Sequence, residues 1–168
     1  MSSKNTNYTE KFNDSYERIF SHRKRLNGDT DDFFNVFLQI FHDKSKKIAM
    51  AFIDSDLKAQ QKMMKSSLLY LINVQGSRLL FSAVESIAES HSANGHNISL
   101  ELYDYWLDSL METVRAFDLK FDEDVELAWR MTLAPGIAFM KYYYDKDIAY
   151  RQPEKNASRH IDHGRPHS

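Results

Sequence analysis

The chain has 168 residues, enough for one compact domain and too few for two ordinary ones. Its formal net charge of −2, with both signs interspersed, argues against a nucleic-acid surface, and the absence of cysteine excludes disulfides, thiolate nucleophiles and iron–sulfur clusters. Five glycines and three prolines supply too few turns for a sheet of many hairpins, so the composition predicts an all-α protein.

The sequence predicts neither a signal peptide nor a membrane span. Its first ten residues are polar, and nowhere do roughly 18 apolar residues follow one another. We therefore expect a cytoplasmic protein that binds no membrane, with residues 1–7 forming a disordered N-terminus.

Two amphipathic helices are predicted at the start of the chain. The first covers residues 8–22 and places Phe12, Tyr16 and Ile19 at helical spacing. The second runs to about His42, and its apolar residues cover more than half of its circumference. We expect this second helix to be deeply buried.

A short basic-then-apolar segment, residues 43–52, leads to a helix predicted for residues 57–74. In that helix Leu57 and Met64 belong to an apolar stripe, and Gln60 lies between them in the same stripe. The helix therefore turns one polar side chain toward the interior.

The next helix, residues 76–91, turns a histidine inward. Leu80, Val84 and Ile87 are spaced four and three apart, and His91 follows by four, so all share one helical face. A lone inward histidine is more often a hydrogen-bonded core residue than a ligand, but the preceding helix offers a second inward polar group. An imidazole that faces a hydrogen-bond donor across an apolar slot suits a planar iron cofactor.

Two long helices complete the predicted domain. Ser99 caps the first and Asp122 opens the second, in which Pro135 should produce a kink or a local break. Residues 151–168 have almost nothing apolar to bury. We therefore expect a folded domain at residues 8–150 and a flexible C-terminal tail after it.

Several short segments, in their order and intervals, resemble a known family. They are Phe37-Leu38-Gln39-Ile40-Phe41, Ile48 to Phe52, Asp56 to Met64, Ile87 to His91 with His96-Asn97-Ile98, Leu102-Tyr103, Ala128-Trp129, and Pro135 to Lys141. Together they are similar to the bacterial globins, particularly the single-domain and flavohaemoglobin-type branch without a reductase domain. The similarity covers about residues 12–147, and the 31 residues from Gln60 to His91 are close to the family's distal-to-proximal interval.

The resemblance implies a globin fold of six to eight helices around a pocket for haem b. His91 would be the proximal ligand and the only metal ligand, and Tyr103 would lie beside it. Phe52 would pack on the haem, and Gln60 would be the distal residue, whose amide can donate to bound dioxygen. The implied cofactor-binding residues are His91, Phe52, Gln60, Met64, Leu38, Phe37 and Tyr103.

Two positions depart from the flavohaemoglobin-type pattern. The tyrosine of the second helix is replaced by Leu38 or Phe37, depending on where a gap is placed, so the distal pocket is less polar. The glutamate that polarises the proximal histidine has no clean counterpart, because Asp145 and Asp147 are the nearest carboxylates. Both losses count against vigorous oxygen chemistry.

His96 is the competing candidate for the iron ligand. It follows a glycine and lies beyond the helix whose apolar stripe faces the core, so we favour His91. The remaining histidines are predicted to be solvated: His22, His42, His160, His163 and His167.

Three functions are compatible with these features. The favoured one is a haem protein that binds dioxygen or another diatomic gas for storage, transport or sensing. A nitric-oxide dioxygenase or weak peroxidase is the second, and it would require an external reductase because the chain has no room for a flavin and nicotinamide domain. A haem-free regulatory module of globin shape is the third. We expect a monomer or a homodimer that binds no nucleic acid.

Overall fold

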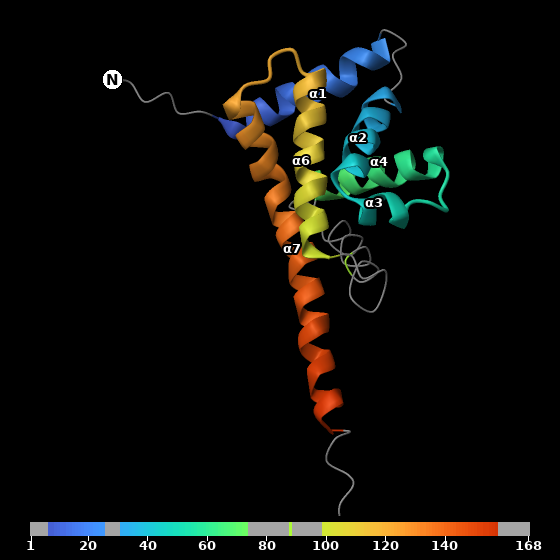
Figure 1. The fold of residues 1–168 in the computed structure, drawn as a ribbon. Coiled ribbons are helices and arrows are strands. Elements are labelled where there is room, and N and C mark those ends of the chain that lie inside the picture. The colour runs from blue at the N-terminus through green and yellow to red at the C-terminus, as the bar shows by residue number, and fades with distance from the viewer. Residues whose placement is uncertain (1–6, 26–30, 74–87, 89–98, 158–168) are drawn as a thin grey trace, which may run out of the picture.

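The computed structural model describes residues 7–25, 31–73, 88 and 99–157. Within these ranges the chain is all-helical, as the composition predicts, and no strand occurs (Figure 1). The helices are α1 (Tyr8–Arg25), α2 (Asp31–Lys44), α3 (Lys46–Ala51), α4 (Leu57–Asn73), α6 (Leu100–Phe117) and α7 (Glu123–Ala157). None of them is both long enough and apolar enough to cross a membrane.

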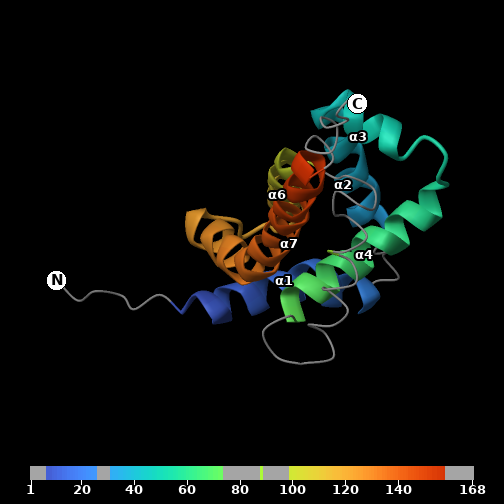
Figure 2. The same ribbon diagram turned by 90° about the horizontal axis from the view of Figure 1, so that it is seen from below.

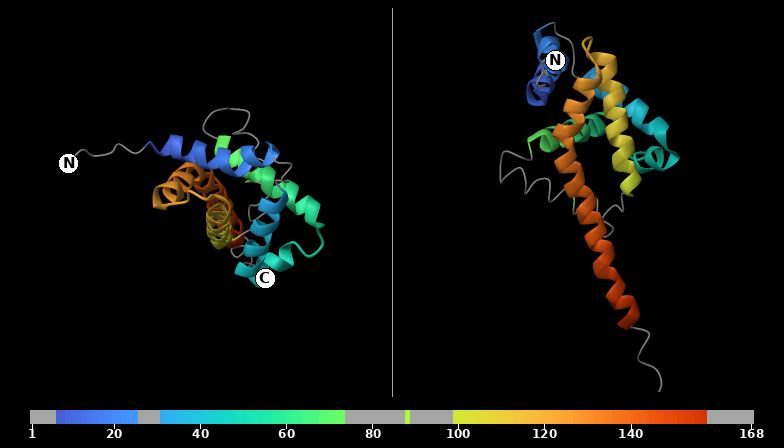
Figure 3. Two further views of the ribbon diagram at one scale, coloured as in Figure 1. Left: turned by 90° about the horizontal axis from the view of Figure 1, so that it is seen from above. Right: turned by 90° about the vertical axis from the view of Figure 1, so that its left-hand side faces the viewer.

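An antiparallel pair, α6 and α7, forms the centre of the described structure (Figures 1 and 3). The helix α2 packs on α6, whereas α1 and α4 pack on α7. Seen from below, α1, α2 and α4 surround this pair on adjoining sides (Figure 2). The C-terminal half of α7 extends beyond the other described helices (Figure 1).

The core is rich in aromatic rings contributed by α1, α2 and α7. Trp129 is fully buried, and the ring of Phe12 meets its indole edge-on with 4.7 Å between centroids. Phe33 and Phe37 on α2 are also fully buried, which confirms that this helix is deeply embedded. Edge-to-face ring pairs of this kind contribute about 0.5–1.5 kcal/mol beyond the area that they bury.

The helices α4 and α7 approach closely where Gly136 faces Leu71. A Cβ atom at Gly136 would lie only 2.5 Å from Leu71 Cδ2. Pro135, the preceding residue, is exposed and lies within α7, which continues through it without an interruption. Of the kink or local break expected at this proline, the break is therefore absent. Pro135 lies on the exposed side of the helix, and Gly136 makes the packing contact with α4.

Two helix starts behave differently from each other. The carboxylate of Asp122 accepts from the Val125 amide at 2.7 Å, which confirms that Asp122 opens α7. Ser99 occupies the N-cap position of α6, but its hydroxyl makes no capping hydrogen bond. At the other end of the chain α7 reaches Ala157, so the helix includes residues 151–157, the first part of the predicted tail.

Candidate functional site

Six of the predicted cofactor-binding residues lie in the described part of the chain. Phe37 and Leu38 are on α2, Phe52 follows α3, and Gln60 is on α4; Met64 and Tyr103 are on α4 and α6. The two candidate iron ligands, His91 and His96, lie outside the described residues. The proximal assignment therefore stays a prediction.

A continuous apolar wall connects three of these six residues, Phe37, Phe52 and Met64. The ring of Phe37 meets Trp106 edge-on at 5.7 Å and stacks on Phe41 at 5.7 Å, and Phe41 in turn meets Phe52 at 6.3 Å. On the other side, the Trp106 indole donates to the Met64 sulfur at 3.4 Å. Side chains from α2, α4 and α6 are thus linked in one series of contacts, which ends at Phe52 in the α3–α4 turn.

Gln60 completes this wall and is buried, as its place in the apolar stripe of α4 predicts. Its amide nitrogen donates to the Ser55 carbonyl at 2.8 Å and to the Phe52 carbonyl at 3.2 Å. Because backbone carbonyls only accept, this pair of partners determines which end of the carboxamide is the nitrogen. The amide oxygen is buried and meets no hydrogen-bond donor in the part of the chain that the structure describes.

His42 is a residue that sequence reasoning placed wrongly. We expected it to be solvated, but its imidazole stacks on Phe52 with 5.3 Å between centroids and an interplanar angle of 25°. Its Nε2 atom is buried and unpaired within the described ranges. His42 directly follows Phe41 on α2, so it lies at the edge of the buried face of that helix. That adjacency is the signal that could have identified it.

One described residue, Ala88, represents the segment that precedes the predicted proximal histidine. Ala88 is buried and packs with Met140 of α7 in a small apolar cluster. Tyr103 packs against the same cluster, together with Tyr70 and Phe139. The structure therefore packs Tyr103 against the cluster that contains Ala88, and Ala88 is three residues before His91 in the sequence.

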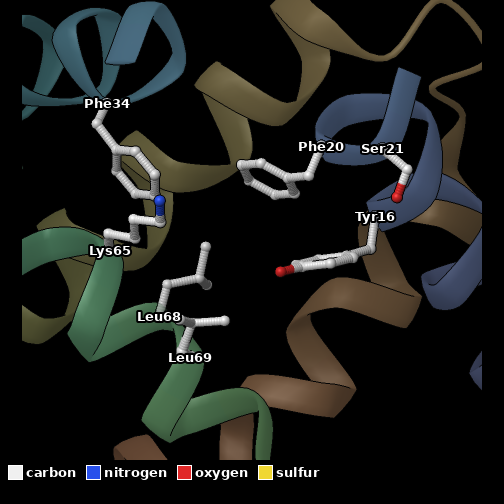
Figure 4. Close-up of a pocket in the computed structure, with 7 residues that line it drawn as sticks. All are labelled: Tyr16, Phe20, Ser21, Phe34, Lys65, Leu68 and Leu69. Carbon is white, nitrogen blue, oxygen red and sulfur yellow. The ribbon is translucent and has the colours of Figure 1, made fainter. Parts of the chain in front are cut away.

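A separate cavity lies among α1, α2 and α4, away from this wall (Figure 4). Its volume is about 250 Å³, and its lining residues are Tyr16, Phe20, Ser21, Phe34, Lys65, Leu68 and Leu69. Burial raises the pKa of the Tyr16 hydroxyl above its ordinary value. The lining includes none of the predicted cofactor-binding residues, so this cavity is not the predicted haem site.

A buried ionic network joins α1 to the turn between α6 and α7, and sequence reasoning did not find it. The Asp118 carboxylate accepts from the Ser15 hydroxyl at 2.6 Å, from Arg18 Nε and Nη2 at 2.7 Å each, and from the Lys120 amide at 3.0 Å. The Trp129 indole donates to the Ser15 hydroxyl at 2.9 Å. Every strong acceptor position is used, which suits a structural role.

The electrostatics of Asp118 follow from these contacts. Burial acts to raise its pKa, but the hydrogen bonds from Arg18 and Ser15 and from the Lys120 amide outweigh it, so the pKa lies below the ordinary value of 3.8. Arg18, in turn, has its pKa raised by the hydrogen bond to Asp118. In the described ranges no three histidine or carboxylate side chains gather in a group that could hold a metal ion.

Comparison with known proteins identifies the fold. No protein-family model matches the chain, and no curated protein sequence matches it. A solved structure does match, that of protein PA3967 from Pseudomonas aeruginosa PAO1, described as structurally highly homologous to a human hemoglobin. The two chains are 30% identical with a TM-score of 0.70, over 82% of this chain and 98% of the other. This confirms the globin fold, whereas the flavohaemoglobin-type branch stays a prediction. The chain therefore belongs to the same family as this hemoglobin-like bacterial protein.

Proposed function

We propose that this protein binds haem b and, through it, dioxygen or another diatomic gas. The observation that carries the proposal is the 30% identity over most of both chains to a protein described as homologous to a human hemoglobin. Haem iron would supply the atom to which a gas binds. His91 would hold the iron, and the pocket would be lined by Phe52, Gln60, Met64, Leu38, Phe37 and Tyr103.

The described residues that would line the pocket have the chemistry that such a cofactor needs. Phe37 and Met64 are buried and apolar, and they join Phe52 through ring contacts and a sulfur hydrogen bond. Two polar atoms, Gln60 Oε1 and His42 Nε2, are buried without a partner in the described ranges, and both belong to side chains that contact Phe52. Unpaired buried polar atoms are costly, which supports a bound group or ligand on this side of the chain.

The low polarity of the distal side favours gas binding over turnover. Leu38 or Phe37 would occupy the place where the flavohaemoglobin-type pattern has a tyrosine, and both residues are almost fully buried. Neither can donate a hydrogen bond, so neither can stabilise charge that develops on a reacting oxygen. We therefore propose storage, transport or sensing rather than a dioxygenase or peroxidase activity, which would also need an external reductase.

The test is an absorption spectrum of the purified full chain after haem addition, in wild type and two histidine variants. His91→Ala should lower haem retention or shift the spectrum strongly, whereas His96→Ala should change it little, because only His91 would form the axial bond. A normal spectrum in His91→Ala with haem loss in His96→Ala would reverse the assignment. A wild-type chain that takes up no haem would favour the haem-free regulatory module.

A further inference from the structure

We infer that Gln60 serves the distal side as a fixed hydrogen-bond acceptor, so that the pocket favours small ligands that carry a hydrogen, such as hydrosulfide, over ligands that only accept. This inference rests on the proposed function and reverses the donor role that the resemblance implies for Gln60.

Gln60 lies in the first turn of α4 and faces the interior. Its side chain shares the buried face of the helix with Met64, Leu68 and Leu71, and it is only 6% exposed. The start of α4 is capped, because the Asp56 carboxylate accepts from the Ala59 amide at 2.9 Å. Gln60 is thus held on a well-anchored first turn that faces the interior.

Both hydrogens of the Gln60 amide nitrogen are donated to backbone carbonyls. The nitrogen donates to the carbonyls of Ser55 at 2.8 Å and Phe52 at 3.2 Å. The turn that presents these carbonyls is itself hydrogen-bonded, since the Ser55 amide donates to the Phe52 carbonyl at 3.1 Å. Rotating the carboxamide by half a turn would lose both bonds and place its oxygen against two carbonyl oxygens. The orientation is therefore strongly preferred.

The amide oxygen of Gln60, Oε1, takes no part in these bonds. Because the nitrogen points to the α3–α4 turn, Oε1 is directed away from it, and it is buried with no donor among the described residues. A buried carbonyl without a partner gains most from a ligand that can donate to it. Dioxygen and carbon monoxide cannot donate, whereas hydrosulfide can. Gln60 would stabilise only the second kind of ligand.

The orientation is tested first, in a way that needs no haem. Gln60→Glu replaces the donating nitrogen by an oxygen that faces two backbone carbonyls, which cannot become donors. Gln61→Glu is the matched control, because Gln61 donates to the Asn35 side-chain oxygen and that amide can rotate to donate instead. At pH 7 we expect Gln60→Glu to lower the melting temperature roughly 5 °C more than Gln61→Glu.

The pH dependence of these melts strengthens the orientation test. A protonated carboxyl can donate to one carbonyl again, so the deficit of Gln60→Glu should shrink as the pH falls toward 4.5, unlike that of the control. Equal melting temperatures for the two variants at pH 7, or a deficit that does not respond to pH, would overturn the fixed orientation.

The ligand selection is tested on the haem-loaded ferric protein with hydrosulfide and cyanide as probes. Gln60→Leu, which remains available if the glutamate variant does not fold, should weaken hydrosulfide binding several-fold and leave cyanide binding nearly unchanged. In the ferrous protein the dissociation rates of dioxygen and carbon monoxide should change by similar factors. A selective rise in dioxygen dissociation, or equal effects on both anions, would overturn the acceptor role. A chain that takes up no haem would refute the proposed function and the ligand selection with it, whereas the melting experiment would still decide the orientation.

Discussion

Arg18 on α1 donates two hydrogen bonds of 2.7 Å each to the carboxylate of Asp118, although 100 positions separate the two residues in the chain. The Asp118 side chain is fully buried, while a quarter of the Arg18 side chain is exposed. This bidentate pair fastens the first helix to the turn between α6 and α7, beside the fully buried Trp129. Bidentate pairs of arginine and carboxylate are among the stronger hydrogen-bonded contacts in proteins.

Removing the charge of Asp118 should therefore destabilise the protein strongly. Asp118→Asn leaves Arg18 without its anion and should lower the free energy of unfolding by about 2–4 kcal/mol. Asp104→Asn is the control, because Asp104 pairs with Lys141 at 2.7 Å on the surface and should matter by about 0–1 kcal/mol. Urea unfolding followed by circular dichroism measures both. Equal losses in the two variants would show that the buried pair contributes no more than a surface one.

The same carboxylate should make the protein sensitive to acid. The pKa of Asp118 is lower in the folded chain than its ordinary value of 3.8, so its contribution is complete above that value and is lost as the pH falls through the folded pKa. The difference in unfolding free energy between wild type and Asp118→Asn should be constant near neutral pH and should shrink below about pH 4. Unfolding curves at a series of pH values test this, and a difference that stays constant down to pH 2.5 would contradict it.

Because α4 and α7 approach closely at Gly136, the loss of stability on substitution there should grow with the size of the new side chain. An alanine there needs only a shift of the Leu71 Cδ2 atom, and its better helix propensity offsets part of the cost, so Gly136→Ala should change stability by less than about 1 kcal/mol. Gly136→Leu should push the helices apart and cost about 1–3 kcal/mol. The control is Ala134→Leu, at an exposed position of α7. If both leucine variants unfold at the same urea concentration, the contact is not tight.

Local patterns predicted the parts of the structure that depend on neighbours in sequence. The inward position of Gln60 follows from the apolar stripe of its own helix, and the capping by Asp122 follows from the residues that come directly after it. The globin fold followed from the order and intervals of several short segments, and the related solved structure confirms it.

Contacts that depend on the tertiary arrangement could not be predicted from the sequence. Nothing near Asp118 in the chain indicates that Ser15 and Arg18 would surround it. The partners of the Gln60 amide are likewise set by the shape of the α3–α4 turn, which exposes two backbone carbonyls to it. Hydropathy spacing shows that a polar side chain faces inward, but it does not show whether a donor or an acceptor remains available there.

A last prediction concerns the missing tyrosine of the second helix, for which the sequence left Phe37 and Leu38 as alternatives. The structure favours Phe37, because its ring stacks on Phe41, and Phe41 in turn contacts Phe52. Phe37→Tyr adds one hydroxyl with little change in shape. Leu38→Tyr instead forces a larger ring into a position that is only 2% exposed.

In the haem-loaded protein Phe37→Tyr should slow dioxygen dissociation by roughly tenfold, because a new donor would reach an acceptor ligand that Gln60 cannot serve. Carbon monoxide dissociation should change far less, since its outer atom carries little negative charge. Without a ligand the added hydroxyl is buried and unpaired, so the apoprotein should lose about 1–3 kcal/mol of stability. Stopped-flow or flash-photolysis rates for both gases, in both tyrosine variants, make the comparison. If Leu38→Tyr slows dioxygen dissociation and Phe37→Tyr does not, Leu38 and not Phe37 is the counterpart of the missing tyrosine.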